Sequence, residues 1–300
     1  MPITEKQREQ RKNYIGASDV AALFGLDPFR TPYDVYLEKT DKLERDKIIT
    51  GAMERGTFIE SAILDWFAHA TGLAIIRNQF RSAKSNGIPL GSHCDAIASD
   101  NGFPIEAKSQ GAYTTMEVWG DPGSDEIPDR VNLQAHAAMI CTSTILCYVP
   151  VYLAYRDFQL FEVQLCEEVK DAIIDRVCCF WEDNVQKDIP PEGLPSLSVI
   201  KRVKRTPNKV AEIDLALVEA FEESNQILKN AEKKKNEAQA AILAALGDAE
   251  AATAGSRNLT YYTQTARRID STRLKKEKPE IAAEYLKESV YPVLRFPKSL

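Results

Sequence analysis

The sequence lacks the features of a membrane protein and of a zinc or iron–sulfur protein. Its longest apolar run, Ile145–Tyr155, contains Pro150 and is too short to cross a bilayer. It has six cysteines and three histidines, but no Cys-x-x-Cys pair and no Cys/His spacing that suits zinc or an iron–sulfur cluster. No basic, apolar signal segment stands at its start. We therefore expect reduced thiols, no membrane partner and a cytoplasmic location.

Charge is divided unevenly along the chain. The 300 residues carry a net charge of −6, with 44% hydrophobic and 27% charged residues, which is typical of a globular protein able to bury a core without cross-links. Residues 1–196 hold 19 Lys and Arg against 30 Asp and Glu, a balance of −11, whereas residues 197–300 hold 19 against 14, a balance of +5. The basic last part could therefore help an acidic first part to hold a polyanion.

Hydrophobic periodicity predicts a mixed α/β domain with a helical extension. The domain is expected to end at Pro190–Pro195, because two adjacent prolines and a glycine cannot continue a helix. This gives a first domain over 1–196 and a basic, mainly helical extension over 197–300. The expected helices lie at 18–25, 32–40, 55–71, 129–142, 167–187, 210–246 and 271–287, the last broken at Pro279, and the expected strands at 73–80, 89–99, 103–108, 145–153, 158–165, 258–264 and 290–296.

One predicted hairpin gathers charged residues. Asn101-Gly102 is typical of a two-residue hairpin turn. With that turn, facing residues have numbers that sum to 203, so Asp95 lies opposite Lys108 and diagonal to Glu106. Strand alternation then puts these three on one face. The other face is expected to be a core face of Cys94, Ala96, Ala98, Phe103, Ile105 and Ala107.

The charged group has the chemistry of metal-assisted phosphodiester hydrolysis. Asp95, Glu106 and the Ala107 carbonyl are oxygen ligands suited to one hard divalent cation. Lys108 could orient the attacking water or neutralise charge on the phosphate. The alternative is a surface Asp–Lys pair, which is common and contributes little to stability.

Two further residues could join this group. Glu60 follows the apolar position Ile59 on the 55–71 helix and could point back over a sheet edge, or be a solvated helix glutamate. Gln134, on the 129–142 helix, could hydrogen-bond an attacking water or be an ordinary exposed amide. Position alone leaves both alternatives open.

Ordered motifs over roughly residues 11–165 resemble the YqaJ-type viral recombinase family, the phage lambda exonuclease branch of the PD-(D/E)XK nucleases. The motifs are Gly16-Ala-Ser-Asp-Val-Ala-Ala-Leu-Phe-Gly-Leu26, Thr31-Pro-Tyr-Asp-Val-Tyr-Leu-Glu-Lys-Thr40, Met53-Glu-Arg-Gly-Thr-Phe-Ile-Glu60, Asp95, Glu106-Ala-Lys108 and Leu133-Gln134. The resemblance implies a restriction-endonuclease-like core with a mixed central sheet flanked by helices. It also implies phage or prophage origin.

The resemblance also implies roles for individual residues. Asp95 and Glu106 would bind Mg²⁺, with Mn²⁺ able to substitute, Lys108 would be the catalytic lysine, and Glu60 and Gln134 would complete the metal or water network. Arg11 and Ser18 would hold the 5′ phosphate of the digested strand, which suits a guanidinium and a hydroxyl near a helix start; Ser18 could equally be a plain helix cap. The chain departs from the family at Cys94 and Ala96, usually proline and glycine, and at His136, usually glutamine.

These features favour a 5′→3′ exonuclease acting on double-stranded DNA ends, which would supply single-stranded tails to a single-strand annealing recombination protein. An endonuclease of the same fold in restriction or defence, and a catalytically silent DNA-end or recombinase-binding module, are the alternatives. The basic run could contact the DNA backbone through Lys201, Arg202, Lys204 and Arg205. The long helix after this run could instead serve oligomer contacts, and the family resemblance implies a ring-shaped homo-oligomer such as a trimer.

Overall fold

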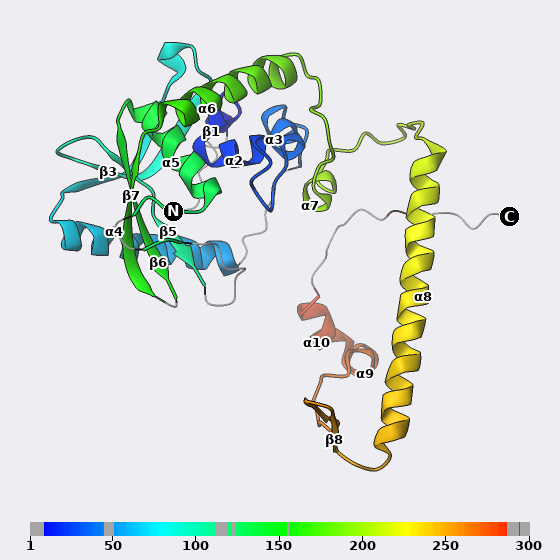
Figure 1. Ribbon diagram of the computed structural model, residues 1–300. Coiled ribbons are helices and arrows are strands. Elements are labelled where there is room, and N and C mark those ends of the chain that lie inside the picture. Colours follow the sequence, from blue (N-terminus) through cyan, green and yellow to red (C-terminus); the bar gives the residue numbers. More distant parts are fainter. Residues whose placement is uncertain are drawn as a thin grey trace. The chain divides into compact units, whose positions relative to one another are not determined.

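The computed structural model describes residues 9–44, 51–111, 119–121, 124–154, 156–286 and 294. The chain forms two compact units, Met1–Arg205 and Thr206–Leu300 (Figure 1). The first unit extends past the proline-rich segment at which we expected the boundary, because helix α7 (Leu197–Ile200) buries Val199 in its core. Within the described ranges, no helix is long and apolar enough to cross a bilayer.

A mixed sheet of seven strands, all within the described residues, forms the centre of the first unit. β1 runs parallel to β3, and β4 and β5 run parallel to β6, whereas the other pairs are antiparallel. This is the mixed central sheet that the family resemblance implied. The strands are β1 (Ile15–Gly16), β2 (Ile75–Ser82), β3 (Leu90–Ala98), β4 (Pro104–Ile105), β5 (Lys108–Gln110), β6 (Leu146–Leu153) and β7 (Asp157–Gln164).

Helices flank this sheet, and their starts follow local sequence signals. The Thr31 hydroxyl accepts a hydrogen bond from the Asp34 backbone N–H at 3.2 Å, and Pro32 is the first helical residue, as the Thr-Pro pair predicted. Ser18 does not cap a helix, because Gly16 is the cap residue and Ser18 lies inside the short turn. The helices are η1 (Ala17–Asp19), α2 (Val20–Leu23), α3 (Pro32–Lys39), α4 (Gly51–Thr71), η2 (Lys84–Asn86), α5 (Asp129–Thr142), α6 (Glu167–Phe180) and η3 (Trp181–Gln186).

Two helices cover opposite faces of the sheet. On β6, Tyr148 packs with Phe67 of α4, whereas its neighbour Val149 belongs to the cluster around Met139 of α5. Because successive residues of a strand point to opposite faces, α4 and α5 must lie on different sides of the sheet (Figure 1). A site at the broken strand β4–β5 can therefore receive side chains from both helices.

The turn between β3 and β4 differs from the prediction. Ala96 pairs with Ile105, so the pair numbers sum to 201 rather than 203. Four residues, Ser99–Gly102, make the connection, and the Gly102 N–H donates to the Ala98 carbonyl. A two-residue turn of the expected type needs positive φ at both central residues, but here only Gly102, at φ 75°, has it.

The corrected register changes which residues face each other. One step beyond the Ala96–Ile105 pair, Asp95 stands opposite Glu106, not opposite Lys108 as predicted. A shift of two residues does not by itself change which residues share a face, since strand alternation has a period of two. Continuing this register puts Asp95 beside Glu106, and Lys108, the first residue of β5, joins them through its ion pair with Glu106.

The expected core face is divided between the two helices. Ala96, Ala98 and Ile105 pack in the cluster that contains Phe67 of α4. Cys94, two residues before Ala96, instead forms a cluster with Ile97 and with Ala138 of α5. Strand alternation therefore breaks at Asp95.

The second unit contains one long helix, two short strands and two short helices. β9 is the strand predicted at 258–264, and its partner is β8, which sequence reasoning missed because Ala251–Ala254 has little of the β-branched or aromatic character of strands. The predicted break at Pro279 separates α9 from α10. The strand expected at 290–296 lies outside the described residues apart from Leu294. The elements are α8 (Leu215–Leu246), β8 (Ala251–Ala254), β9 (Arg257–Thr260), α9 (Ser271–Glu277) and α10 (Pro279–Glu284).

Candidate active site

Glu106 is the centre of an acidic cluster where β4 and β5 meet. Its side chain is 1% exposed. Oε2 accepts hydrogen bonds from the Lys108 Nζ at 3.2 Å and from the Gln134 Nε2 at 2.6 Å. Oε1 is also buried, but it has no hydrogen-bond partner within the described part of the chain. A buried oxygen without a partner is costly, so Glu106 is arranged to accept something more.

Asp95 lies beside Glu106 on the neighbouring strand. Its Oδ2 accepts a hydrogen bond from the Ala107 backbone N–H at 2.8 Å. The Ala107 N–H, between β4 and β5, thus holds the Asp95 carboxylate. Glu106 and Lys108, the residues before and after Ala107 in the chain, both direct their side chains into the cluster. Asp95, Glu106 and Lys108 are brought together as the sequence predicted.

The cluster perturbs the ionisation of its members. Burial raises the pKa of Glu106 to about 8, and burial also raises the pKa of Asp95. Burial on its own would lower the Lys108 pKa, but the charges of Glu106 and Asp95 outweigh it and raise that pKa. The site therefore keeps its lysine charged while it disfavours two neighbouring negative charges. A cation placed between the carboxylates would relieve this penalty.

Glu60 approaches the cluster from helix α4. It is half-buried, and its pKa is raised by burial and by the negative charge of Asp95. The structure thus favours the orientation toward the sheet over the solvated alternative. Gln134 likewise points into the cluster from α5, where it donates to Glu106.

The residues present fit a hard divalent cation. Glu106 supplies a buried oxygen without a partner, Asp95 supplies a second carboxylate, and both have pKa values that a nearby cation would lower. Among the described residues no three His, Cys, Asp or Glu side chains converge closely enough to hold a metal by themselves. The Ala107 carbonyl and water molecules would therefore have to complete the ligand set, as is usual for Mg²⁺.

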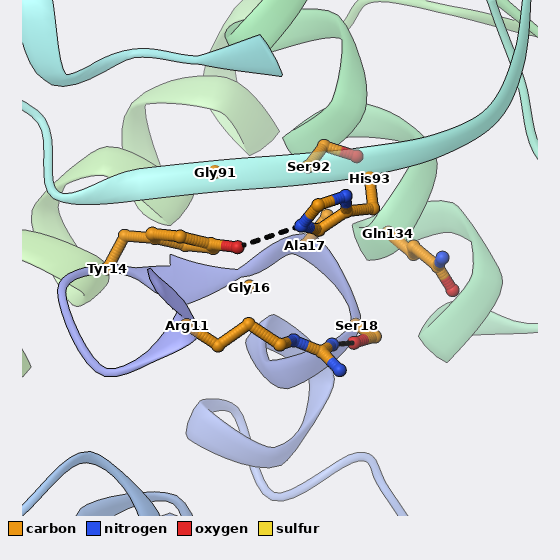
Figure 2. Close-up of a pocket in the computed structure, with 9 residues that line it drawn as sticks. All are labelled: Arg11, Tyr14, Gly16, Ala17, Ser18, Gly91, Ser92, His93 and Gln134. Carbon is orange, nitrogen blue, oxygen red and sulfur yellow. Dashed lines mark hydrogen bonds between the residues drawn. The ribbon is translucent and has the colours of Figure 1, made fainter. Parts of the chain in front are cut away.

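A pocket of about 40 Å³ adjoins the acidic cluster. Arg11 reaches across it, and its Nη2 donates to the Ser18 hydroxyl at 3.3 Å (Figure 2). Gln134, which contacts Glu106, also lines this pocket, so one side chain belongs to both sites. The polar side chains that line it are those of Arg11, Tyr14, Ser18, Ser92, His93 and Gln134.

A buried ion-pair network holds the pocket in place. Asp19 accepts a hydrogen bond from the Gly16 N–H at 3.0 Å and pairs with Lys39 at 2.8 Å and Arg30 at 2.7 Å. Lys39 also donates to the Arg11 carbonyl at 3.0 Å. Burial on its own would raise the Asp19 pKa, but the charges of Lys39 and Arg30 outweigh it and hold that pKa well below its usual range. The network therefore fixes the backbone on both sides of the Arg11–Ser18 contact.

Tyr14 and His93 are pocket residues that sequence reasoning missed. The Tyr14 hydroxyl and the His93 Nε2 share a hydrogen bond of 3.1 Å. Gly91 leaves space for the Tyr14 ring, since a Cβ atom at this position would lie 2.6 Å from it. The available signal was His93 itself, one of three histidines and two residues before Asp95.

His136 has a structural role. Its Nδ1 donates to the Asn132 carbonyl at 3.0 Å, and its Nε2 accepts from the Cys166 backbone N–H at 3.1 Å. The first bond lies within α5, and the second joins α5 to the start of α6. Burial lowers the His136 pKa.

The basic run after α7 lies against the N-terminal part of the first unit. Val203 forms an antiparallel bridge with Leu43, and Lys204 contacts both the carbonyl and the carboxylate of Asp41, at 2.7 and 3.1 Å. Lys201 and Arg205 are exposed, whereas Arg202 is half-buried. The structure does not join this run to the acidic cluster, and its role in binding DNA stays a prediction.

The fold resembles that of a solved exonuclease structure. It is similar to LHK-Exo in complex with dAMP, with a TM-score of 0.50 and 16% identity over 62% of this chain and 94% of that one. Two other structures are also similar. The alkaline exonuclease (LHK-Exo) of Laribacter hongkongensis has a TM-score of 0.49 and 16% identity over 62% of this chain and 94% of that one. A phage related exonuclease of Haemophilus somnus 129PT has a TM-score of 0.45 and 12% identity over 60% of this chain and 97% of that one.

Sequence comparison finds a matching family model and a curated relative. Residues 7–144 match the model of the YqaJ-like viral recombinase domain, which is the family that the motifs resemble. The uncharacterized protein YqaJ of Bacillus subtilis (strain 168) is 24% identical over 293 residues, which cover 93% of this chain and 90% of that protein.

Proposed function

We propose that the protein is a magnesium-dependent 5′→3′ exonuclease that digests one strand from double-stranded DNA ends. The observation that carries this proposal is the double position of Gln134, which lines the pocket of Arg11 and Ser18 and also donates to Glu106. A terminal phosphate held by Arg11 would lie next to the acidic cluster. Cleavage would then fall close to the 5′ end, which gives the direction of digestion.

Each residue of the site has a role in this proposal. Asp95, Glu106 and the Ala107 carbonyl would hold the cation, with Glu60 contributing directly or through water. Bound Mg²⁺ would lower the pKa of a water molecule and offset charge on the phosphate, and Mn²⁺ would substitute for it. Lys108, kept protonated by the two carboxylates, would stabilise negative charge that develops on the phosphate oxygens.

The wider setting is part of the proposal. Single-stranded tails are the substrate of a single-strand annealing protein, which is the proposed partner inside a bacterial cell, and a phage origin fits that process. Lys201, Arg202, Lys204 and Arg205 would contact the DNA backbone, and a ring-shaped homo-oligomer such as a trimer would keep the enzyme on its substrate. Residues 1–196 would then carry catalysis and residues 197–300 would support binding or assembly.

The test is a magnesium-dependent digestion of one duplex in three forms. The linear form carries a 5′ phosphate and a 3′ label, the second form is the same duplex with a 5′ hydroxyl, and the third is a closed circle. We expect processive loss of the 5′ strand from the linear phosphorylated form, with the labelled 3′ end released last, and an intact circle. Nicking of the circle would favour the endonuclease alternative, and tight end binding without hydrolysis would favour the silent module.

A further inference from the structure

Asn78 has a left-handed backbone in the middle of a strand. Its φ is 55°, and within the described strands it is the one interior residue with a positive φ. Its neighbours Arg77 and Gln79 pair with Ala96 and Cys94 of β3, so Asn78 stands opposite Asp95. Left-handed residues other than glycine are uncommon and are concentrated at functional sites.

On the partner strand β3, the alternation of side chains between the two faces changes beside Asn78. Cys94 packs with Ala138 on the α5 side, whereas Ala96, which should share its face, packs with Phe67 on the α4 side. The pair numbers sum to 173 both before and after Asp95, so no extra residue is inserted. The change of face therefore coincides with the left-handed residue and not with an inserted one.

We infer that Asn78 is a positioning residue, whose left-handed backbone turns β2 and β3 so that the Asp95 carboxylate meets the Ala107 N–H beside Glu106. This inference rests on the proposed function. The Asn78 side chain is exposed and makes no hydrogen bond that we find within the described ranges. Its contribution is therefore conformational: after glycine, asparagine is among the residues that tolerate this backbone best.

A conformational role predicts a graded series at one position. Asn78→Gly keeps the backbone accessible, Asn78→Ala makes it less favourable, and Asn78→Val opposes it most, because a β-branched side chain fits the left-handed region worst. The matched control is Asn208→Val, since Asn208 also has a positive φ, of 61°, but lies in the second unit.

The experiment measures Mn²⁺ binding by electron paramagnetic resonance and digestion of 5′-phosphorylated linear duplex at several DNA concentrations. We expect Asn78→Gly to match the wild type within about twofold, and Asn78→Val to lose about tenfold or more in both Mn²⁺ affinity and kcat, with KM for DNA changed by less than about twofold. Asn78→Ala should fall between them. Asn208→Val should keep wild-type values.

Three outcomes would overturn the inference. They are an Asn78→Val variant with wild-type Mn²⁺ affinity and kcat, an Asn78→Gly variant as impaired as Asn78→Val, or an Asn78→Val variant that only becomes less soluble, which would make the kink a protection of an edge strand. If Asn78→Val does not fold, Asn78→Gly and Asn78→Ala decide by the same two measurements. A wild type that neither binds Mn²⁺ nor digests DNA would instead refute the proposed function.

Discussion

Gln134 donates its amide hydrogen to the Glu106 carboxylate at 2.6 Å while its other side lines the pocket of Arg11. We expect Gln134→Met, which keeps the length but removes the donor, to lower the rate of digestion about 10- to 100-fold, because a hydrogen bond to a charged group is lost. Initial rates on linear duplex measure this. The control Gln239→Met, on the exposed surface of α8, should have no effect on the rate. A normal rate in Gln134→Met would show that Gln134 does not couple the Arg11 pocket to the acidic cluster.

Removal of the lysine charge tests the catalytic cluster. Lys108→Met should reduce magnesium-dependent cleavage by about 100-fold or more while DNA binding persists, since in the proposed mechanism Lys108 stabilises charge that develops during the reaction. Lys170→Met, which breaks a surface pair with Glu167, is the matched control. Cleavage rates and gel-shift affinities give the two readouts. Undiminished cleavage by Lys108→Met would contradict the assignment.

The 5′ phosphate role of Arg11 can be tested on two substrates. Arg11→Ala should abolish the preference for phosphorylated over hydroxyl ends, because the guanidinium is the charged donor in the pocket. Digestion of 5′-hydroxyl ends serves as the internal control and should change little. A preference that survives in the variant would remove this role from Arg11.

Burial of Glu106 makes the stability of the metal-free protein depend on pH. Its pKa is raised from the ordinary value of 4.5 to about 8, so between these values the folded chain keeps a proton that the unfolded chain has released. This contribution to stability is present below pH 4.5 and is lost as pH rises toward 8. Thermal melts in a chelator should therefore show Tm falling more steeply with pH in the wild type than in Glu106→Gln. Equal slopes would show that Glu106 is not protonated when folded.

Changing aspartate to asparagine should reduce the free energy of unfolding strongly at buried Asp19 and only slightly at exposed Asp65. Asp19→Asn leaves the buried Lys39 charge without its carboxylate, and we expect a loss of about 3–5 kcal/mol in the free energy of unfolding. Asp65→Asn breaks the pair with Arg77, but Asp65 is 72% exposed, and about 1 kcal/mol or less should be lost. Urea denaturation measures both. Similar values for the two variants would mean that Asp19 is not a buried anchor.

Patterns of short range predicted much of this fold and site. The Thr31-Pro32 pair marked a helix start, and the spacing over 129–142 gave α5 at its observed bounds. The prediction that Asp95 and Glu106 share a face held although the predicted β3–β4 register was wrong, because the register error was two residues and strand alternation has a period of two. The same argument could not give the break at Asp95, since it depends on the backbone of Asn78 in another strand.

Features that depend on distant contacts could not be predicted. Gln134 joins the pocket to the cluster only because α5 packs across β3, and Tyr14 meets His93 across 79 positions of sequence. Glu60 was ambiguous because helix periodicity places a residue beside an apolar stripe without saying what the helix covers. The extent of the first unit was missed because a proline-rich segment ends a helix but does not prevent later residues from packing against the same core.

The bridge between Val203 and Leu43, together with the burial of Val199, ties a late segment to the start of the chain. C-terminal truncations that remove Val199 and Val203 should therefore differ in stability from truncations that keep them. A fragment that ends at residue 196 lacks Val199 and exposes to water the apolar cluster of α3 residues to which Val199 belongs. A fragment that ends at residue 205 keeps that cluster covered. Trimming for crystallisation or fusion should respect the second of these limits.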